Sequence, residues 1–323
     1  MKKIAFFRDK RFENNNFYNV DIDRNLSPFL ELVKINGEEN TLSINRINIR
    51  KDKNDFIIVC RKTLSIFSLL DYVRLFIQYR KNIKYYIILE PIVVAPLWYS
   101  KLFHLFFDKI LTRKDDLIDN NKYFKFTRPQ SYSWLQDSKP FHSRKLIVLM
   151  NANKWSPFPH ELYSERVKFI RYCEKHTKDF DLYGWWWNKA NFQQKICGFN
   201  LFPSYKWRAG NKIETIWNYK FNVCFENMKD TPWYITEKIR DSFKAKTIPI
   251  YRWASNIIEY VPAGCFIDYR EYIWKEYKLF EFLEGMSEEI YNNYIRNIES
   301  FLETNKTQKR FDKERARDFI KLF

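Results

Sequence analysis

A chain of 323 residues with 46% hydrophobic content has enough apolar side chains for more than one core, which excludes an intrinsically disordered protein. Lys and Arg number 56 against 39 Asp and Glu, and the net charge of +17 predicts anionic partners such as nucleic acid, acidic lipid headgroups or phosphorylated small molecules. The 5 Cys are scattered without a C-x-x-C pair and the 4 His lack ligand spacing, so neither a disulfide framework nor a metal centre is expected, and a reducing cytosol is favoured.

The amino terminus predicts a strand rather than a targeting signal. Met1 to Arg8 runs directly into charged residues, which favours a first β-strand over a cleaved apolar segment. The longest apolar stretch, Tyr85 to Tyr99, is interrupted by Glu90, Pro91 and Pro96. A helix spanning a bilayer needs about 20 apolar residues, so no transmembrane segment is expected.

Short β-branched or aromatic runs alternate with helical stretches along the chain, which indicates an α/β protein with parallel sheets. Several of these runs are apolar at consecutive positions, as in strands covered by helices on both faces. The predicted strands are Phe56 to Cys60, Tyr85 to Leu89, Lys145 to Met150, Tyr219 to Phe225 and Thr247 to Tyr251.

A domain boundary is predicted near residue 140. Thr127 to Arg144 contains Pro129 and Pro140 and has little hydrophobic periodicity, as is typical of a linker. The chain shows no internal repeat, and its 6 Gly form neither a dinucleotide-binding fingerprint nor a P-loop.

A helix that begins near Pro159 carries a cation on its apolar face. Leu162, Phe169 and Cys173 share this face, and Arg166 falls among them. An unpaired buried guanidinium is costly, so Arg166 is expected either to lie along the core edge beside a carboxylate or to bind a phosphate at a domain cleft.

The predicted strand Tyr219 to Phe225 ends in two polar residues, Glu226 and Asn227. Open α/β sheets bind ligands at the carboxyl ends of their strands, so both side chains are expected to point into a crevice. Asp230 or Thr231 is the expected amino-terminal cap of the next helix.

Tyr234, Glu237, Lys238 and Asp241 are expected to share one face of that next helix. A phenol, a carboxylate and an ammonium close to a helix amino terminus favour a pocket for a nucleotide sugar, because the terminus itself attracts anions. A solvated helix face with an ordinary ion pair is the alternative.

Four ordered blocks of the chain resemble the signature of the α-1,3-fucosyltransferase family. They are Tyr219 to Asn227, Tyr234 to Ile239, Ile248 to Tyr251 and Pro262 to Asp268. The resemblance extends back through Glu161 to Val167 and Asp181 to Gly184 as far as Glu90 and Pro91.

This resemblance implies a GT-B fold, in which two Rossmann-like domains face each other across a cleft. Residues 1–140 would bind the acceptor, residues 141–304 would hold the donor GDP-fucose, and residues 305–323 would form a basic amphipathic helix. By the same resemblance, Arg166 and Lys238 hold the diphosphate, Glu237 binds the ribose, and Asn227 and Tyr234 complete the donor pocket.

The resemblance also implies that Glu90 is the general base. Transfer of a sugar with inversion needs a base for the acceptor hydroxyl and cations for the departing diphosphate, and paired cations can replace a divalent metal. No metal or other cofactor is therefore expected. A buried structural carboxylate is the alternative role for Glu90.

The chain departs from the family pattern at two places. Family members usually have a Ser between the residues that correspond to Glu90 and Pro91, and often a small residue where this chain has Arg252 and Trp253. The second difference would alter the wall of the donor pocket. Trp185 to Trp187 is also unusual, and could either stack on a sugar or cover the core.

The tail from Asn305 to Phe323 carries seven Lys or Arg against three acids, with Phe311, Phe319 and Phe323 at helical spacing. It is expected either to rest peripherally on the inner face of the membrane or to dock across the domains.

The predicted function is that of a cytoplasmic inverting glycosyltransferase that moves L-fucose from GDP-fucose to a hydroxyl of a glycan acceptor, in lipopolysaccharide or surface polysaccharide synthesis. One rival keeps the fold and uses another nucleotide sugar. The other is a basic nucleic-acid-binding protein, suggested by the charge of +17 and 19% aromatic residues. Because the basic residues are dispersed, nucleic acid is not expected as a partner.

Overall fold

The computed structural model describes residues 3–7, 41–44, 56–60, 66–88, 90–126, 139–198, 200–232 and 234–304. These residues belong to two compact units, the first within residues 3–126 and the second within residues 139–304, and the boundary expected near residue 140 stays a prediction. The predicted tail helix, residues 305–323, lies outside the described residues.

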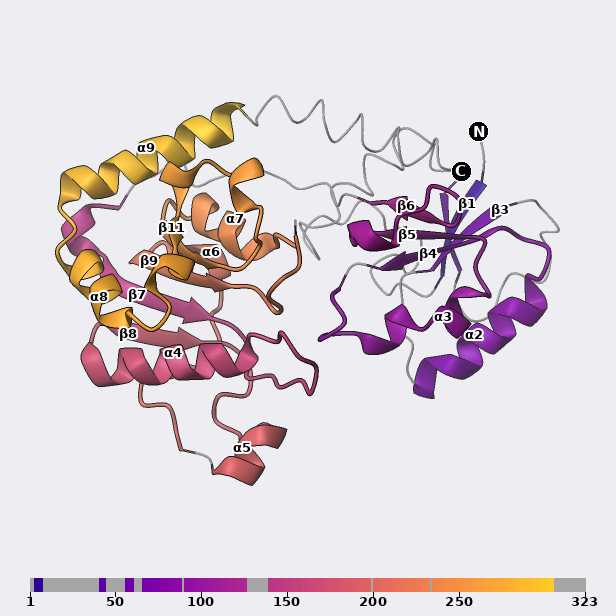
Figure 1. Cartoon of the computed structure of the whole chain (residues 1–323), viewed down its shortest axis with the longest axis horizontal. Coiled ribbons are helices and arrows are strands. Elements are labelled where there is room, and N and C mark those ends of the chain that lie inside the picture. Colours follow the sequence, from indigo (N-terminus) through magenta and orange to yellow (C-terminus); the bar gives the residue numbers. More distant parts are fainter. Residues whose placement is uncertain are drawn as a thin grey trace. The chain divides into compact units, whose positions relative to one another are not determined.

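The first unit contains a parallel sheet in the order β2-β1-β3-β4-β5-β6 (Figure 1). Its strands are β1 (Lys3–Phe7), β2 (Thr41–Ile44), β3 (Phe56–Cys60), β4 (Lys84–Ile88), β5 (Lys109–Thr112) and β6 (Tyr123–Lys125). Its helices are α2 (Ile66–Gln78) and α3 (Lys101–His104), with 3-10 turns at Pro96–Tyr99 and Asp115–Leu117.

Aromatic side chains from α2 and α3 cover one face of this sheet. The ring of Tyr86 on β4 stacks on Phe107 with centroids 4.7 Å apart, and meets Phe103 edge to face at 5.2 Å. Tyr72 on α2 meets the same Phe103 at 5.0 Å. Offset and edge-to-face contacts of this kind add to the free energy gained by burying the rings.

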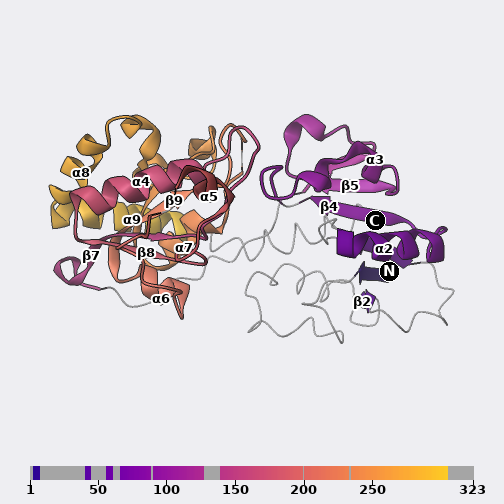
Figure 2. The ribbon, with the colours of Figure 1, turned by 90° about the horizontal axis from the view of Figure 1, so that it is seen from below.

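The second unit contains a parallel sheet in the order β11-β10-β9-β7-β8, of which β7, β8 and β9 are labelled in Figure 2. Its strands are β7 (Lys145–Met150), β8 (Phe180–Tyr183), β9 (Tyr219–Phe225), β10 (Ile248–Arg252) and β11 (Ile267–Asp268). Its helices are α4 (Tyr163–His176), α5 (Phe192–Cys197), α6 (Lys212–Ile216), α7 (Glu237–Lys244), α8 (Glu276–Glu284) and α9 (Glu288–Thr304). Short 3-10 turns lie at Phe141–Ser143, Ile257–Glu259, Ala263–Cys265 and Tyr269–Tyr272.

Helices cover both faces of the second sheet, which explains why its strands are apolar at consecutive positions. Phe225 of β9 packs on Phe169 of α4, with ring centroids 5.3 Å apart. The preceding residue, Cys224, belongs to a different buried cluster with Ile239 and Phe243 of α7. This arrangement confirms the prediction of an α/β protein with parallel sheets.

In each unit the strand order of the sheet reverses beside the first strand of that unit. In each, the second strand along the chain lies on one side of the first strand and the third lies on the other, so the order reverses between β1 and β3 and between β7 and β9. Ligands of open α/β sheets bind beside such a reversal, at the carboxyl ends of the strands. No helix in the described part of the chain is long and apolar enough to cross a membrane.

Candidate functional site

The candidate site of the second unit lies at the carboxyl ends of β7 and β9, where the strand order reverses. Strand β9 ends at Phe225 and is followed by Glu226 and Asn227, while α7 begins at Glu237 and packs on β9 and β10. The five residues predicted to bind the donor come from α4, from the end of β9, from α7 and from the segment just before α7.

Glu226 does not point into a crevice, which corrects the expectation from the sequence. Its side chain is fully buried and accepts hydrogen bonds from the Thr236 amide at 2.8 Å, the Thr236 hydroxyl at 2.7 Å and the Lys238 ammonium at 3.0 Å. Thr236, and not Asp230 or Thr231, is the amino-terminal cap of α7. Glu226 therefore ties the start of α7 to the end of β9.

Arg166, on α4, also contacts the end of β9. Its Nη2 donates hydrogen bonds to the carbonyl oxygens of Phe225 at 2.8 Å and Glu226 at 2.6 Å, and to Oδ1 of Asn227 at 2.9 Å. These three acceptors are uncharged, so the guanidinium is held by neutral groups and not by direct pairing with a carboxylate. Its Nε is buried and has no hydrogen-bond partner among the described residues.

Burial lowers the pKa of Arg166, and the nearby Tyr163 and Glu226 act in the opposite direction. An Arg remains protonated at neutral pH in any protein environment. The second of the two roles left open for Arg166, an anion-binding cation, is thus compatible with its position. The first role, in which Arg166 would lie along the core edge beside a carboxylate, differs from the structure: the side chain is buried and lies beside carbonyl oxygens.

Lys238 contacts the side chain of Glu226, whereas Arg166 contacts its main-chain carbonyl oxygen. Its Nζ donates to Glu226 at 3.0 Å and to the Thr236 hydroxyl at 2.8 Å, and the residue is buried. An ammonium has three N–H donors, so one of them is left for a ligand. Arg166 and Lys238 therefore both contact Glu226 at the end of β9, and their predicted role in binding a diphosphate stays a prediction.

Glu237 is a carboxylate between two cations. Burial alone would raise its pKa, but Lys238 and Lys212 outweigh this effect and hold the pKa at about 2. Lys212 also forms an ion pair with Asp241 at 2.7 Å. Glu237 is consequently ionised at neutral pH and can accept hydrogen bonds from hydroxyl groups.

Asn227 links Arg166 to Tyr234. Its Oδ1 accepts from Arg166, and its Nδ2 donates to the Tyr234 hydroxyl at 3.2 Å. Tyr234 is buried and precedes α7, so it does not share a helix face with Glu237 as the spacing predicted. The contact between Tyr234 and Asn227 depends instead on the bend of the chain between Asn227 and Thr236.

Glu90 lies in the first unit, two residues beyond the end of β4. It is half-buried, and its carbonyl oxygen accepts a hydrogen bond from the Tyr99 hydroxyl at 2.9 Å. The burial of Tyr99 raises the pKa of its phenol, and the charge of Glu90 raises it further. The structure thus places Glu90 at the carboxyl edge of its own sheet, where catalytic groups of α/β folds lie.

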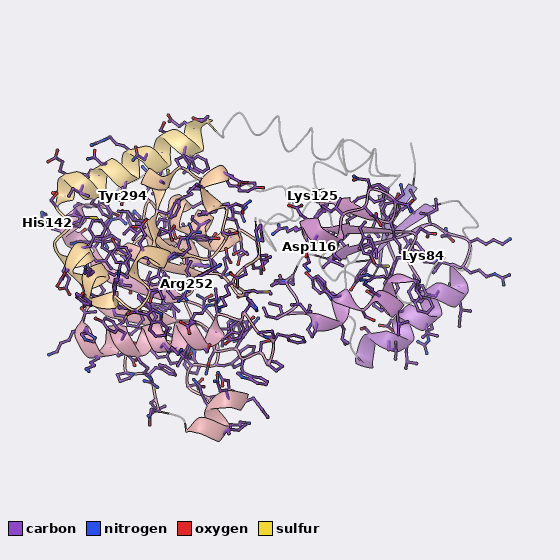
Figure 3. The ribbon with its side chains drawn as sticks, viewed as in Figure 1. Lys84, Asp116, Lys125, His142, Arg252 and Tyr294 are labelled. Carbon is purple, nitrogen blue, oxygen red and sulfur yellow. The ribbon has the colours of Figure 1, made fainter. Side chains whose placement is uncertain are left out.

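Two further polar residues, Asn153 and Arg252, lie at the carboxyl edge of the second sheet, and only Arg252 was singled out in the sequence, as a departure from the family pattern. Asn153, which follows β7, donates from Nδ2 to the carbonyl oxygen of Lys189 at 2.9 Å and to Oε1 of Gln194 at 2.9 Å. Glu165 pairs at 3.3 Å with Arg252, labelled in Figure 3, at the end of β10. Each polar residue follows or ends a strand, which is the signal that could have identified it.

Among the described residues no group of three or more His, Cys, Asp or Glu could hold a metal ion. The described cysteines, Cys60, Cys173, Cys224 and Cys265, are free and buried.

Two parallel α/β units with the same reversal of strand order define a GT-B glycosyltransferase fold. The sequence model of glycosyltransferase family 10 (fucosyltransferase), C-terminal part, matches residues 144–319, and the chain belongs to this family. The matched residues include all five predicted donor-binding residues and exclude Glu90.

One curated protein is similar to this chain in sequence, and two solved structures are similar to it in fold. The chain is 53% identical over 45 residues to an α-(1,3)-fucosyltransferase, FucT, from Helicobacter pylori, a match that spans 14% of this chain and 9% of that protein. The fold is similar to a crystal structure of an α1,3-fucosyltransferase with GDP-fucose, with a TM-score of 0.51 and 15% identity over 94% of this chain and 89% of the other. It is also similar to an α-glucosyltransferase in complex with UDP and a 13-mer DNA, with a TM-score of 0.57 and 11% identity over 94% and 95% of the two chains.

Proposed function

We propose that the protein transfers L-fucose from GDP-fucose to a hydroxyl group of a glycan, with inversion at the sugar carbon. The observation that carries this proposal is the convergence of Arg166 and Lys238 on Glu226 at the reversal of strand order. Membership of glycosyltransferase family 10 supports fucose as the sugar, and the donor complex of the similar crystal structure supports GDP as the nucleotide.

Arg166 and Lys238 are the proposed ligands of the diphosphate. Both side chains are buried, so their charges are weakly screened, and each retains N–H groups beyond those bound to protein acceptors. As the bond from the sugar to the diphosphate breaks, negative charge grows on the departing oxygen. Cations held in place beforehand stabilise that charge without reorganisation, and this is the role that a metal ion fills in other transferases.

Glu237 is the proposed ligand of the ribose. Its low pKa keeps it ionised, and an ionised carboxylate accepts hydrogen bonds from the two ribose hydroxyls. Asn227 and Tyr234 complete the proposed donor pocket, with Asn227 also holding the guanidinium of Arg166 in place.

Glu90 is the proposed general base that takes the proton of the acceptor hydroxyl. Inversion requires the hydroxyl to attack from the side opposite to the diphosphate, so the base has to lie on that side of the sugar. The acceptor is proposed to be a glycan of lipopolysaccharide or another surface polysaccharide, and the reaction to take place in the cytoplasm. The peripheral membrane contact of the tail, residues 305–323, stays a prediction.

A turnover screen across GDP-, UDP- and dTDP-sugars tests the donor. We expect release of GDP from GDP-fucose in the presence of a glycan acceptor, and turnover of only a non-fucosyl donor would refute the proposal. A gel-shift titration with an oligonucleotide tests the nucleic-acid alternative, which would gain support if binding were dependent on salt and unaffected by GDP.

A further inference from the structure

Apolar and basic side chains gather on the segment between β8 and α6. Six apolar residues, each between 51% and 72% exposed, project here: Trp185, Trp186, Phe192, Ile196, Leu201 and Trp207. Lys189, Lys195 and Arg208 are exposed among them. We call these nine residues the aromatic–basic surface, and Figure 1 shows its helix, α5, standing out from the body of the second unit.

Contacts within the segment bring Trp185, Trp186, Trp207 and Arg208 together, and α5 carries two more of the apolar side chains. The rings of Trp185 and Trp186 lie 6.0 Å apart, and the guanidinium of Arg208 lies 3.9 Å from the ring of Trp185. The Gly184 amide donates to the Trp207 carbonyl at 3.0 Å, which holds Trp207 beside the same turn. Phe192 and Ile196 are four residues apart on α5 and therefore lie on one face of it.

Hydrogen bonds and close backbone packing hold the main chain beneath the surface. Asn153 binds the carbonyl oxygens of Trp186 and Lys189 at 3.3 and 2.9 Å. Gly184, with φ of +136°, comes so close to the main chain of residue 151 that a Cβ would lie 1.9 Å from its carbonyl oxygen. Trp186 and Trp207 have φ of +69° and +72°, a conformation that bulky residues adopt only when their surroundings impose it.

The charge of the segment indicates which kind of partner it can bind. Between Asp181 and Glu214 the chain has five Lys or Arg and no acidic residue. Two of the five, Lys206 and Lys212, pair with Asp181 and Asp241, which leaves the cations of the aromatic–basic surface to meet an external anion.

We propose that the aromatic–basic surface docks on a bilayer that contains anionic lipids. Trp rings and the alkyl stems of Lys and Arg suit the boundary between headgroups and acyl chains, and the aliphatic side chains of Ile196 and Leu201 suit the layer below it. The surface has no carboxylate, so its charged groups are all cations and complement the negative charge of the lipid headgroups. This inference does not depend on the proposed transfer reaction.

Sedimentation of the full-length protein with vesicles tests the proposal. We expect binding to vesicles of phosphatidylcholine with phosphatidylglycerol and little binding to phosphatidylcholine alone. Trp186→Ser with Ile196→Ser, and separately Lys189→Glu with Lys195→Glu, should each weaken binding about tenfold or more, because apolar burial and each added cation contribute independently. Unchanged binding of both double variants would overturn the proposal.

Matched controls exclude a general effect of exposed residues. Trp274 and Ile258 are 80% and 65% exposed elsewhere on the second unit, and their replacement by Ser should leave vesicle binding unchanged. GDP affinity should equal that of the wild type in every variant, which shows that the fold is intact. The tail provides the competing explanation: if Lys309→Glu with Arg310→Glu abolishes vesicle binding and the variants of the aromatic–basic surface do not reduce it, the proposal is wrong.

Discussion

Replacement of Glu226 by Gln probes the buried ion pair at the centre of the candidate site. Glu226 is fully buried, and its Oε2 lies 3.0 Å from Nζ of the buried Lys238. Loss of one partner of a buried ion pair costs about 3–5 kcal/mol, because the other charge is left uncompensated. Gln can still accept the hydrogen bond of the Thr236 amide, so the lower figure, about 3 kcal/mol, is expected.

Each kcal/mol lowers the melting temperature of a unit of this size by about 2–4 °C, so the Glu226→Gln variant should melt about 6–12 °C below the wild type. The diphosphate of GDP would supply the anion that Lys238 has lost. A ligand stabilises a protein more when it relieves an unfavourable charge, so the rise in melting temperature on adding GDP should be larger in the variant than in the wild type.

Calorimetric melting with and without saturating GDP measures both effects. Asp181→Asn is the matched control, because Asp181 on β8 is also buried and pairs at 2.7 Å with Lys145 on β7. This control should melt lower than the wild type but show the wild-type response to GDP. If the response of Glu226→Gln to GDP is no larger than that of the wild type, the diphosphate does not meet Lys238 and the reasoning is refuted.

Further predictions concern the two cations, the base and the carboxylate of α7. Arg166→Ala and Lys238→Ala should each weaken GDP binding about tenfold or more in titration calorimetry, since a hydrogen bond to a charged group contributes about 1.5–3 kcal/mol. The control variant Lys175→Ala, at an exposed position on α4, should bind GDP like the wild type. Wild-type affinity in either site variant would count against the diphosphate site. Glu90→Gln should leave GDP affinity unchanged and lower the rate of transfer about 10²–10⁴-fold, as expected for a base that acts on the acceptor, and equal loss of both would contradict this role. Glu237 has a folded pKa of about 2 against an ordinary 4.5, so its contribution to stability is present above pH 4.5 and is lost as the pH falls towards 2. Urea unfolding between these pH values should show a shallower loss of stability in Glu237→Gln than in the wild type, and identical pH dependences would disprove the low pKa.

Most of the fold that positions the site was predictable from hydrophobic patterns. The five predicted internal strands correspond to β3, β4, β7, β9 and β10, because strands buried on both faces appear as continuous apolar runs. β5 (Lys109–Thr112), β6 (Tyr123–Lys125) and β8 (Phe180–Tyr183) were not predicted as strands. They are three or four residues long and contain polar residues, so their strand structure depends on pairing with a neighbour and leaves little pattern in the sequence.

The sequence pattern does not predict which of the three consecutive Trp residues is buried. Trp185, Trp186 and Trp187 are chemically identical, and the sequence could assign them equally to the core or to a surface. In the structure Trp187 is buried and its indole donates to the carbonyl oxygen of Asn151 at 2.6 Å, while its two neighbours are half exposed. The turn after β8, with Gly184 at positive φ, separates them, and this geometry depends on contacts with the loop after β7.

The hydrophobic pattern was enough to predict that Glu226 and Asn227 follow a strand, whereas the grouping of Arg166 with Lys238 was an implication of the family resemblance. Only the tertiary structure decided that Glu226 turns inward to bind Lys238 while Asn227 turns towards Arg166 and Tyr234. Beyond the last residue of a strand the regular alternation of side chains ends, so their direction is set by hydrogen bonds to groups distant in sequence.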